Sequence, residues 1–143
     1  FNNFKVAIVL FVGGALFGVT AILVLAFNGL FIGYFGTKVP IVSYLAFIIP
    51  HGIFEVPGLV LSAFAGFILC SFIIKIIKGL FTKDLKKSDK IKLVFNENLD
   101  MLKQSLALLI LAIILIFVAA FIEVNLTQYI AVNVFNVSLP NLK

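Results

Sequence analysis

Charged residues are scarce in this chain of 143 residues: Asp, Glu, Lys and Arg make up 12% of it, against 63% hydrophobic residues. A soluble domain carries about 25% charged residues, because its surface must be solvated. With a mean hydropathy of +1.25, this chain has too few polar groups to cover such a surface. The composition excludes a soluble globular domain and predicts a surface that mostly faces lipid.

Cysteine is nearly absent as well, with Cys70 as its single representative. One thiol excludes an intrachain disulfide and a metal site built from several thiolates. The sequence also lacks an HExxH motif, a glycine-rich phosphate loop and a GxSxG nucleophile motif. We therefore assign no catalytic residue, and the sequence favours a role other than catalysis.

The net charge of +5 comes from lysine alone, because the chain contains no arginine. Seven of the lysines fall within eighteen positions beside apolar stretches: Lys75, Lys78, Lys83, Lys86, Lys87, Lys90 and Lys92. This placement is typical of a cytoplasmic segment near anionic lipid head groups, and it argues against nucleic acid as a partner. We expect a multi-pass protein of the cell membrane, with the lipid bilayer as a partner and residues 78–103 in the cytoplasm.

Three stretches are long and apolar enough to cross a membrane as helices: residues 6–27, 52–77 and 102–123. Residues 40–49 precede Pro50, which cannot continue the hydrogen-bond ladder of a helix. This segment is too short to cross, so the sequence predicts a re-entrant or interfacial half-helix there.

Residues 78–101 are predicted to form a cytoplasmic loop, and residues 82–103 combine charged residues with apolar residues at helical spacing. This pattern predicts an amphipathic helix that lies on the cytoplasmic face of the membrane and runs into the next span. The segments together predict an all-α fold, a polytopic transmembrane helix bundle with about three spans that forms one domain over residues 1–143. Because the chain begins with Phe and shows no signal-peptide pattern, we expect it to start within a longer protein.

Small residues recur on the predicted spans, mostly at four-residue spacing: Gly14, Gly18, Gly58, Ser62 and Gly66. Residues four apart share one face of a helix, and small side chains there let two backbones approach each other. We expect helices to pack closely at these five positions. The same chemistry suits contact with other membrane proteins or with a second copy in a homo-oligomer.

Three ionisable side chains fall within or at the edge of the spans: His51, Glu55 and Glu123. An ionised carboxylate in hydrocarbon costs at least a few kcal/mol, so such residues are functional candidates. The topology predicted from the lysines places all three near the outer side, together with Asn28 at the end of the first span. The sequence thus predicts a polar intramembrane site of these four residues.

Three interpretations of this group remain open. In the first, His51 and Glu55 form a hydrogen bond that caps the predicted break, and Glu123 reaches the outer interface. In the second, the imidazole and the two carboxylates hold a divalent metal such as Zn. In the third, the same groups relay protons or ions.

Four sequence segments carry a resemblance to a known family: Phe1-Asn2-Asn3, the NGLFIG stretch of residues 28–33, the PHGIFE stretch of residues 50–55 and the AAFIE stretch of residues 119–123. In these segments the chain resembles the stage II sporulation protein M family of integral membrane proteins. The resemblance implies a polytopic membrane protein. It also implies a scaffold role like that of members from sporulating bacteria, which look like scaffolds that hold cell-wall hydrolases. Two classes of function follow: a membrane scaffold or assembly factor, or a transporter, channel or metal-dependent intramembrane protein that uses the polar site.

Overall fold

The computed structural model describes residues 2–81 and 87–133, and every element in these ranges is helical. The elements are α1 (Asn2–Ala15), α2 (Val19–Gly36), α3 (Ile41–Phe81), α4 (Lys87–Ile122), the π-helical turn η1 (Glu123–Thr127) and α5 (Gln128–Asn133). Among the described residues, three helical stretches are long and apolar enough to cross a membrane: α2, α3 and Ile91–Thr127. The predicted all-α bundle with three spans is confirmed.

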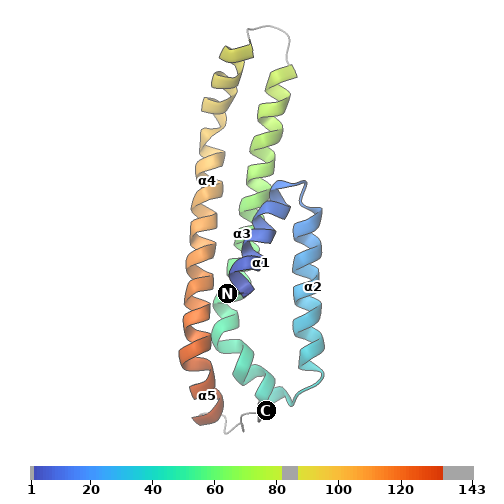
Figure 1. Ribbon diagram of the computed structural model, residues 1–143, viewed down its shortest axis with the longest axis vertical. Coiled ribbons are helices and arrows are strands. Elements are labelled where there is room, and N and C mark those ends of the chain that lie inside the picture. Colours follow the sequence, from blue (N-terminus) through green and yellow to red (C-terminus); the bar gives the residue numbers. More distant parts are fainter. Residues whose placement is uncertain (1, 82–86, 134–143) are drawn as a thin grey trace.

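Helices α3 and α4 form the long axis of the molecule as an antiparallel pair (Figure 1). With 41 and 36 residues they measure about 61 and 54 Å, well beyond the hydrocarbon core of about 30 Å. The buried hydroxyl of Ser105 on α4 donates to the carbonyl oxygen of Ala65 on α3 at 2.8 Å. Farther along, the side chain of Ile116 and the carbonyl oxygen of Ala112 pack against the backbone of Gly58. These contacts hold the two helices together within their apolar sections.

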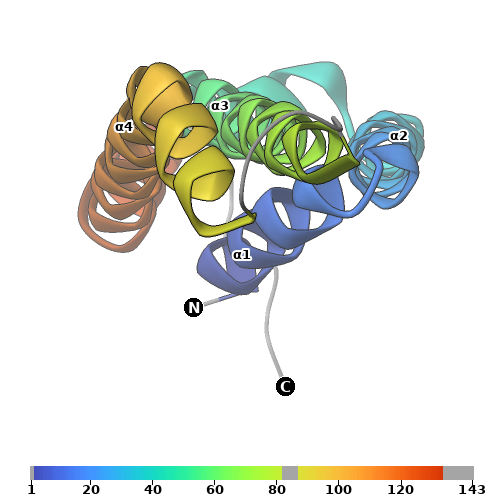
Figure 2. The same cartoon turned by 90° about the horizontal axis from the view of Figure 1, so that it is seen from above.

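The predicted span over residues 6–27 is wrong, because the chain reverses direction at residues 16–18. Phe17 and Gly18 have φ angles of 62° and 78°, which place both in the left-handed region. Glycine adopts this region without steric cost, whereas Phe17 is strained there. Residues 16–18 are Leu, Phe and Gly, which are as apolar as the residues of a span, so hydropathy alone does not reveal the turn. Helix α1 crosses α3 obliquely, and α2 stands apart from the α3–α4 pair (Figure 2).

The predicted half-helix over residues 40–49 is also wrong, because α3 continues through Pro50 and Pro57. Figure 1 shows that the first part of α3 bends toward the lower end of α2. Each proline removes one N–H from the ladder, and a membrane helix tolerates this loss as a kink when nearby groups satisfy the freed carbonyl. The prolines thus bend one long helix instead of dividing it in two.

The predicted amphipathic helix of residues 82–103 runs into the next span as expected, whereas its predicted position on the membrane face is a third correction. Helix α3 runs to Phe81 and α4 begins at Lys87, and residues 82–86 lie outside the described ranges. The charged start of α4 continues directly into its apolar section and packs against the end of α3, where Gly79 contacts Val94. A continuous helix cannot both cross the membrane and lie flat on it, so this section extends away from the bilayer.

Candidate functional site

The small residues of α1 and α3 bring two backbones into direct contact. A Cβ atom added to Gly14 would lie 2.7 Å from the carbonyl oxygen of Ala63 and 3.0 Å from the Cα of Gly66. The fully buried Ser62 hydroxyl donates to the Ala7 carbonyl oxygen of α1 at 2.7 Å. Helix α1 is therefore fixed on α3 by close backbone packing and one buried hydrogen bond.

The other predicted packing residues also face neighbouring parts of the chain. A Cβ atom on Gly58 would lie 2.9 Å from Cγ1 of Ile116 on α4. Gly18 faces the ring of Phe67, although it lies in the α1–α2 turn and not on a helix face. By contrast, among the described residues no heavy atom lies within 4 Å of a Cβ added to Gly29 or Gly33 of α2, apart from their chain neighbours and the backbone of their own helix.

A polar group lies where the bent part of α3 meets the end of α4. The Nε2 atom of His51 is 3.8 Å from Oε2 of Glu55, one helical turn farther along α3. Its Nδ1 atom is 3.4 Å from the hydroxyl oxygen of Thr127 on η1. The side chains of His51 and Glu55 are each 16% exposed, so both lie largely inside the protein. The imidazole therefore has a polar neighbour at each of its two nitrogens.

The π-helical turn η1 explains how Thr127 reaches His51. A π turn adds one residue to a helical turn and rotates the residues that follow it, and such turns often occur at functional sites. Thr127 is 4% exposed, and its hydroxyl also lies 3.3 Å from the Ile122 carbonyl oxygen, to which it donates. Thr127 is not among the residues predicted for the polar site, although its spacing of four residues from Glu123 is a signal that could have identified it.

The remaining predicted residues of the site take separate positions. Glu123 begins η1 and is close enough to Glu55 for their charges to interact. Asn28 lies in the middle of α2, because the chain reversal at residues 16–18 moves it away from a helix end, and its amide donates to the Val24 carbonyl oxygen at 2.8 Å. The structure thus brings His51, Glu55 and Thr127 together, places Glu123 nearby and engages Asn28 within its own helix.

The donor set does not fit a metal ion in this arrangement. Within the described residues, no three His, Cys, Asp or Glu side chains lie together in a way that could hold one. His51 and Glu55 provide one imidazole and one carboxylate, and Glu123 does not complete the set. A protein zinc site needs at least three such ligands, and His51 and Glu55 supply two.

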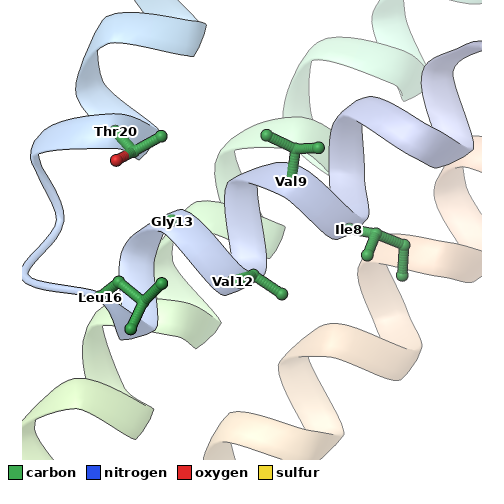
Figure 3. A pocket seen from close by; sticks show the side chains of 6 residues that line it. All are labelled: Ile8, Val9, Val12, Gly13, Leu16 and Thr20. Atoms are coloured by element: carbon green, nitrogen blue, oxygen red, sulfur yellow. The ribbon is translucent and has the colours of Figure 1, made fainter.

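An apolar groove lies between the end of α1 and the start of α2, apart from the polar group (Figure 3). It has a volume of about 260 Å³ and is lined by Ile8, Val9, Val12, Gly13, Leu16 and Thr20. The Thr20 hydroxyl is its single polar side-chain group. Such a lining suits contact with hydrocarbon chains and supplies no acid, base or nucleophile.

The sequence model for stage II sporulation protein M matches residues 1–128. The chain belongs to the stage II sporulation protein M family. The match ends directly after Thr127, so the family region contains the whole polar group of α3 and η1.

Two relatives from Methanocaldococcus jannaschii extend this comparison, and both are described as uncharacterized. The protein MJ0793 is 38% identical over 135 residues, which is 91% of the present chain and 69% of the relative. The protein MJ0706 is 34% identical over 139 residues, which is 94% of the chain and 56% of the relative. This member of the stage II sporulation protein M family therefore spans about half to two thirds of the length of these relatives. No solved structure matches the chain.

Proposed function

We propose that the chain is a membrane scaffold or assembly factor whose α2 contacts other membrane proteins or a second copy of the chain. One observation carries this proposal: α2 is long and apolar enough to span, yet it packs little on its own bundle (Figure 2). Counting only the described residues, Ala21 is the one residue of α2 that is buried.

The small residues of the chain divide into two groups, which supports the same proposal. Gly58 and Gly66 contact other helices of the bundle. Gly29 and Gly33, in contrast, lie four residues apart and face open space. Apolar helices gain little by leaving lipid for one another, so their association depends on close packing at small residues. The open pair on α2 offers such a packing surface, and a scaffold role agrees with what the family resemblance implies.

Cross-linking in membranes tests the role of α2. Cysteine is introduced at Gly29 or Gly33 in a Cys70→Ser background, and a short bifunctional maleimide reagent is added. Phe31, which is 71% exposed and about 200° around the helix from Gly29, provides the matched control position. We expect cross-links to a second copy or another membrane protein from the glycine positions and few from Phe31. Equal yields from all three positions, or no cross-links at all, would contradict the proposal.

The polar group favours a second candidate function, the relay of protons or small cations. The supporting observation is the position of His51, whose nitrogens face Glu55 of α3 and Thr127 of η1. A neutral imidazole can accept a proton at one nitrogen and release one from the other, so this arrangement could pass a proton between the two helices. Buried ionisable residues in membrane helices commonly line such pathways.

Proton flux into liposomes tests this second function. The purified protein is reconstituted with a pH-sensitive dye inside the vesicles, and a pH step is applied outside. We expect His51→Gln to abolish protein-dependent flux, because the amide cannot take up and release a proton. Ser71→Ala is the control, since Ser71 is exposed and its hydroxyl donates to the Phe67 carbonyl oxygen of its own helix. Unchanged flux in His51→Gln, or no flux with the unaltered protein, would exclude the relay.

A further inference from the structure

Helix α1 carries its single charged side chain on the face opposite to α3. This residue is Lys5, which is exposed together with Ile8, Val9 and Val12. Helical geometry places these four within about 100° of one another, and we call them the lysine face. Gly14 contacts α3 and follows Lys5 by nine positions, so it lies about 180° around α1 from Lys5. In Figure 2 no other helix of the described residues covers the outer side of α1.

The apolar section of α4 marks one edge of the hydrocarbon core. Residues 104–122 contain no charged side chain and measure about 28 Å, which matches the core thickness of about 30 Å. The Ser105 hydroxyl donates to the Ala65 carbonyl oxygen, so Ala65 lies at the corresponding edge on α3. Residues of α3 that precede Ala65 therefore lie deeper in the core.

Lys5 lies inside this core. The hydrogen bond from Ser62 to Ala7 fixes α1 on α3 one turn deeper than the edge. Lys5 precedes Ala7 by two residues, toward the deeper end of α1, which places it about 6–9 Å inside the core. Figure 1 agrees with this depth, since α1 starts level with the middle of α2.

The described residues supply no counter-charge for Lys5. The Cα–Cβ bonds of a helix tilt toward its N-terminus, which in α1 is the deeper end, so Lys5 is directed away from the nearer head groups. The ion pairs described are His51–Glu55 and Lys103–Asp100, and neither includes Lys5. Lysines at such depth usually pair with a carboxylate or line a water-filled cavity.

The surroundings of Lys5 favour the carboxylate. Ile8, Val9 and Val12 of the lysine face form one wall of the apolar groove, whose single polar side-chain group is a hydroxyl (Figure 3). Such a lining does not hydrate an ammonium group, and lipid head groups lie outside the core. A second copy packed symmetrically on this face would bring its own Lys5, and like charges oppose association.

We propose that the lysine face binds a transmembrane helix of another membrane protein, which carries one carboxylate at the depth of Lys5. The carboxylate offsets the charge of Lys5, and apolar side chains of the same helix enter the groove. This surface belongs to α1 and is separate from the open glycine pair of α2, so it does not depend on the contacts proposed for α2.

Energy transfer in liposomes of neutral lipid tests this proposal. The full chain carries a donor dye on Cys70, and the probe is a synthetic transmembrane peptide of Leu and Ala with an acceptor dye. One peptide has a single Glu about 6–9 Å inside its apolar section, and its partner has Gln there, which keeps the size and the hydrogen bonds but not the charge. We expect the Glu peptide to bind at least about tenfold more tightly. Equal affinity for the two peptides would overturn the proposal.

Variants of the chain locate the binding surface. Lys5→Met keeps an apolar side chain of similar length, and it should reduce binding of the Glu peptide to that of the Gln peptide. Lys38→Met removes the same charge between α2 and α3, and this control should bind like the unaltered chain. Lys5→Glu should bind a peptide with Lys in place of Glu better than it binds the Glu peptide. Unaffected binding by Lys5→Met, or no exchange of preference in Lys5→Glu, would contradict the assignment.

A spin label at position 12, in a Cys70→Ser background, separates the other occupants. Without peptide, we expect lipid-soluble oxygen to relax the label, and the Glu peptide should reduce this accessibility. Preferential relaxation by a water-soluble reagent would show that a water-filled cavity surrounds the lysine face. Dipolar coupling between labels on two chains would show a second copy there. Either of these results would replace the acidic transmembrane helix as the occupant.

Discussion

Gly66→Ala adds one methyl group at the closest contact between α1 and α3. The new Cβ atom would touch the carbonyl oxygen of Phe11 and lie 2.9 Å from Cα of Gly14 and 3.1 Å from the amide nitrogen of Ala15. Ordinary contacts of a Cβ atom are 3.4–4 Å. All three neighbours are backbone atoms, so no side chain can rotate away, and α1 must move off α3.

The expected cost follows from what this movement breaks. Forcing an extra methyl group into a well-packed contact costs about 1–3 kcal/mol. Ser62 lies one turn before Gly66 on α3, so the displacement of α1 also lengthens the hydrogen bond from Ser62 to Ala7. Hydrogen bonds between membrane helices contribute about 0.6 kcal/mol on average and up to about 1.7. We therefore expect Gly66→Ala to lower the free energy of unfolding by about 2–4 kcal/mol.

Unfolding in mixed micelles with increasing SDS measures this change, with helix content followed by circular dichroism and α1–α3 contact followed by a donor–acceptor dye pair. Gly29→Ala is the matched control, because among the described residues a Cβ atom there has no contact within 4 Å. The control should leave stability unchanged or slightly increased, since alanine favours the helix over glycine. If Gly66→Ala and Gly29→Ala unfold at the same SDS fraction, the backbone contact between α1 and α3 is not as described.

Three further outcomes are expected. Ser62→Ala should destabilise the protein by about 0.6–1.7 kcal/mol in the same assay, whereas Ser71→Ala, which loses only an exposed bond within its helix, should have no effect. Gly18→Ala should cost about 1–2 kcal/mol, because its φ of 78° is unfavourable for any residue with a Cβ atom, and an unchanged melting temperature would argue against the turn. Single cysteines at Lys38 and Lys92, in a background without the natural cysteine, should react with an impermeant maleimide from opposite sides of the membrane, and reaction from one side would refute the topology.

The sequence predicted the features that depend on composition and on spacing within one helix. The number of spans agreed with the number of long apolar stretches, although the first span is Val19–Gly36 and not residues 6–27. The pairing of His51 with Glu55 followed from their spacing of four residues. Small residues such as Gly58 and Gly66 could be placed in helix contacts, because close approach of backbones in lipid needs a missing side chain.

The features that the sequence did not predict depend on local backbone geometry. The turn at Phe17 is built from apolar residues, so its hydropathy equals that of a span. Pro50 was expected to end a helix, but it bends α3 instead. Ending a helix within lipid would leave several backbone groups unpaired, which costs more than the one hydrogen bond that proline removes. The contact of Thr127 with His51 depends on the π turn, and no pattern of residue types specifies where such a turn forms.

The two prolines of α3 have a consequence for the dynamics of this end of the molecule. Without their N–H groups, the carbonyls of Ala46 and Ile53 have lost their usual partners in the helix ladder. A helix with two missing bonds over two turns opens locally at a lower free energy than the uninterrupted section after Pro57. Amide hydrogens in the first part of α3 should therefore exchange with solvent deuterium faster than those around Gly66, and the imidazole of His51 lies in the section that opens first.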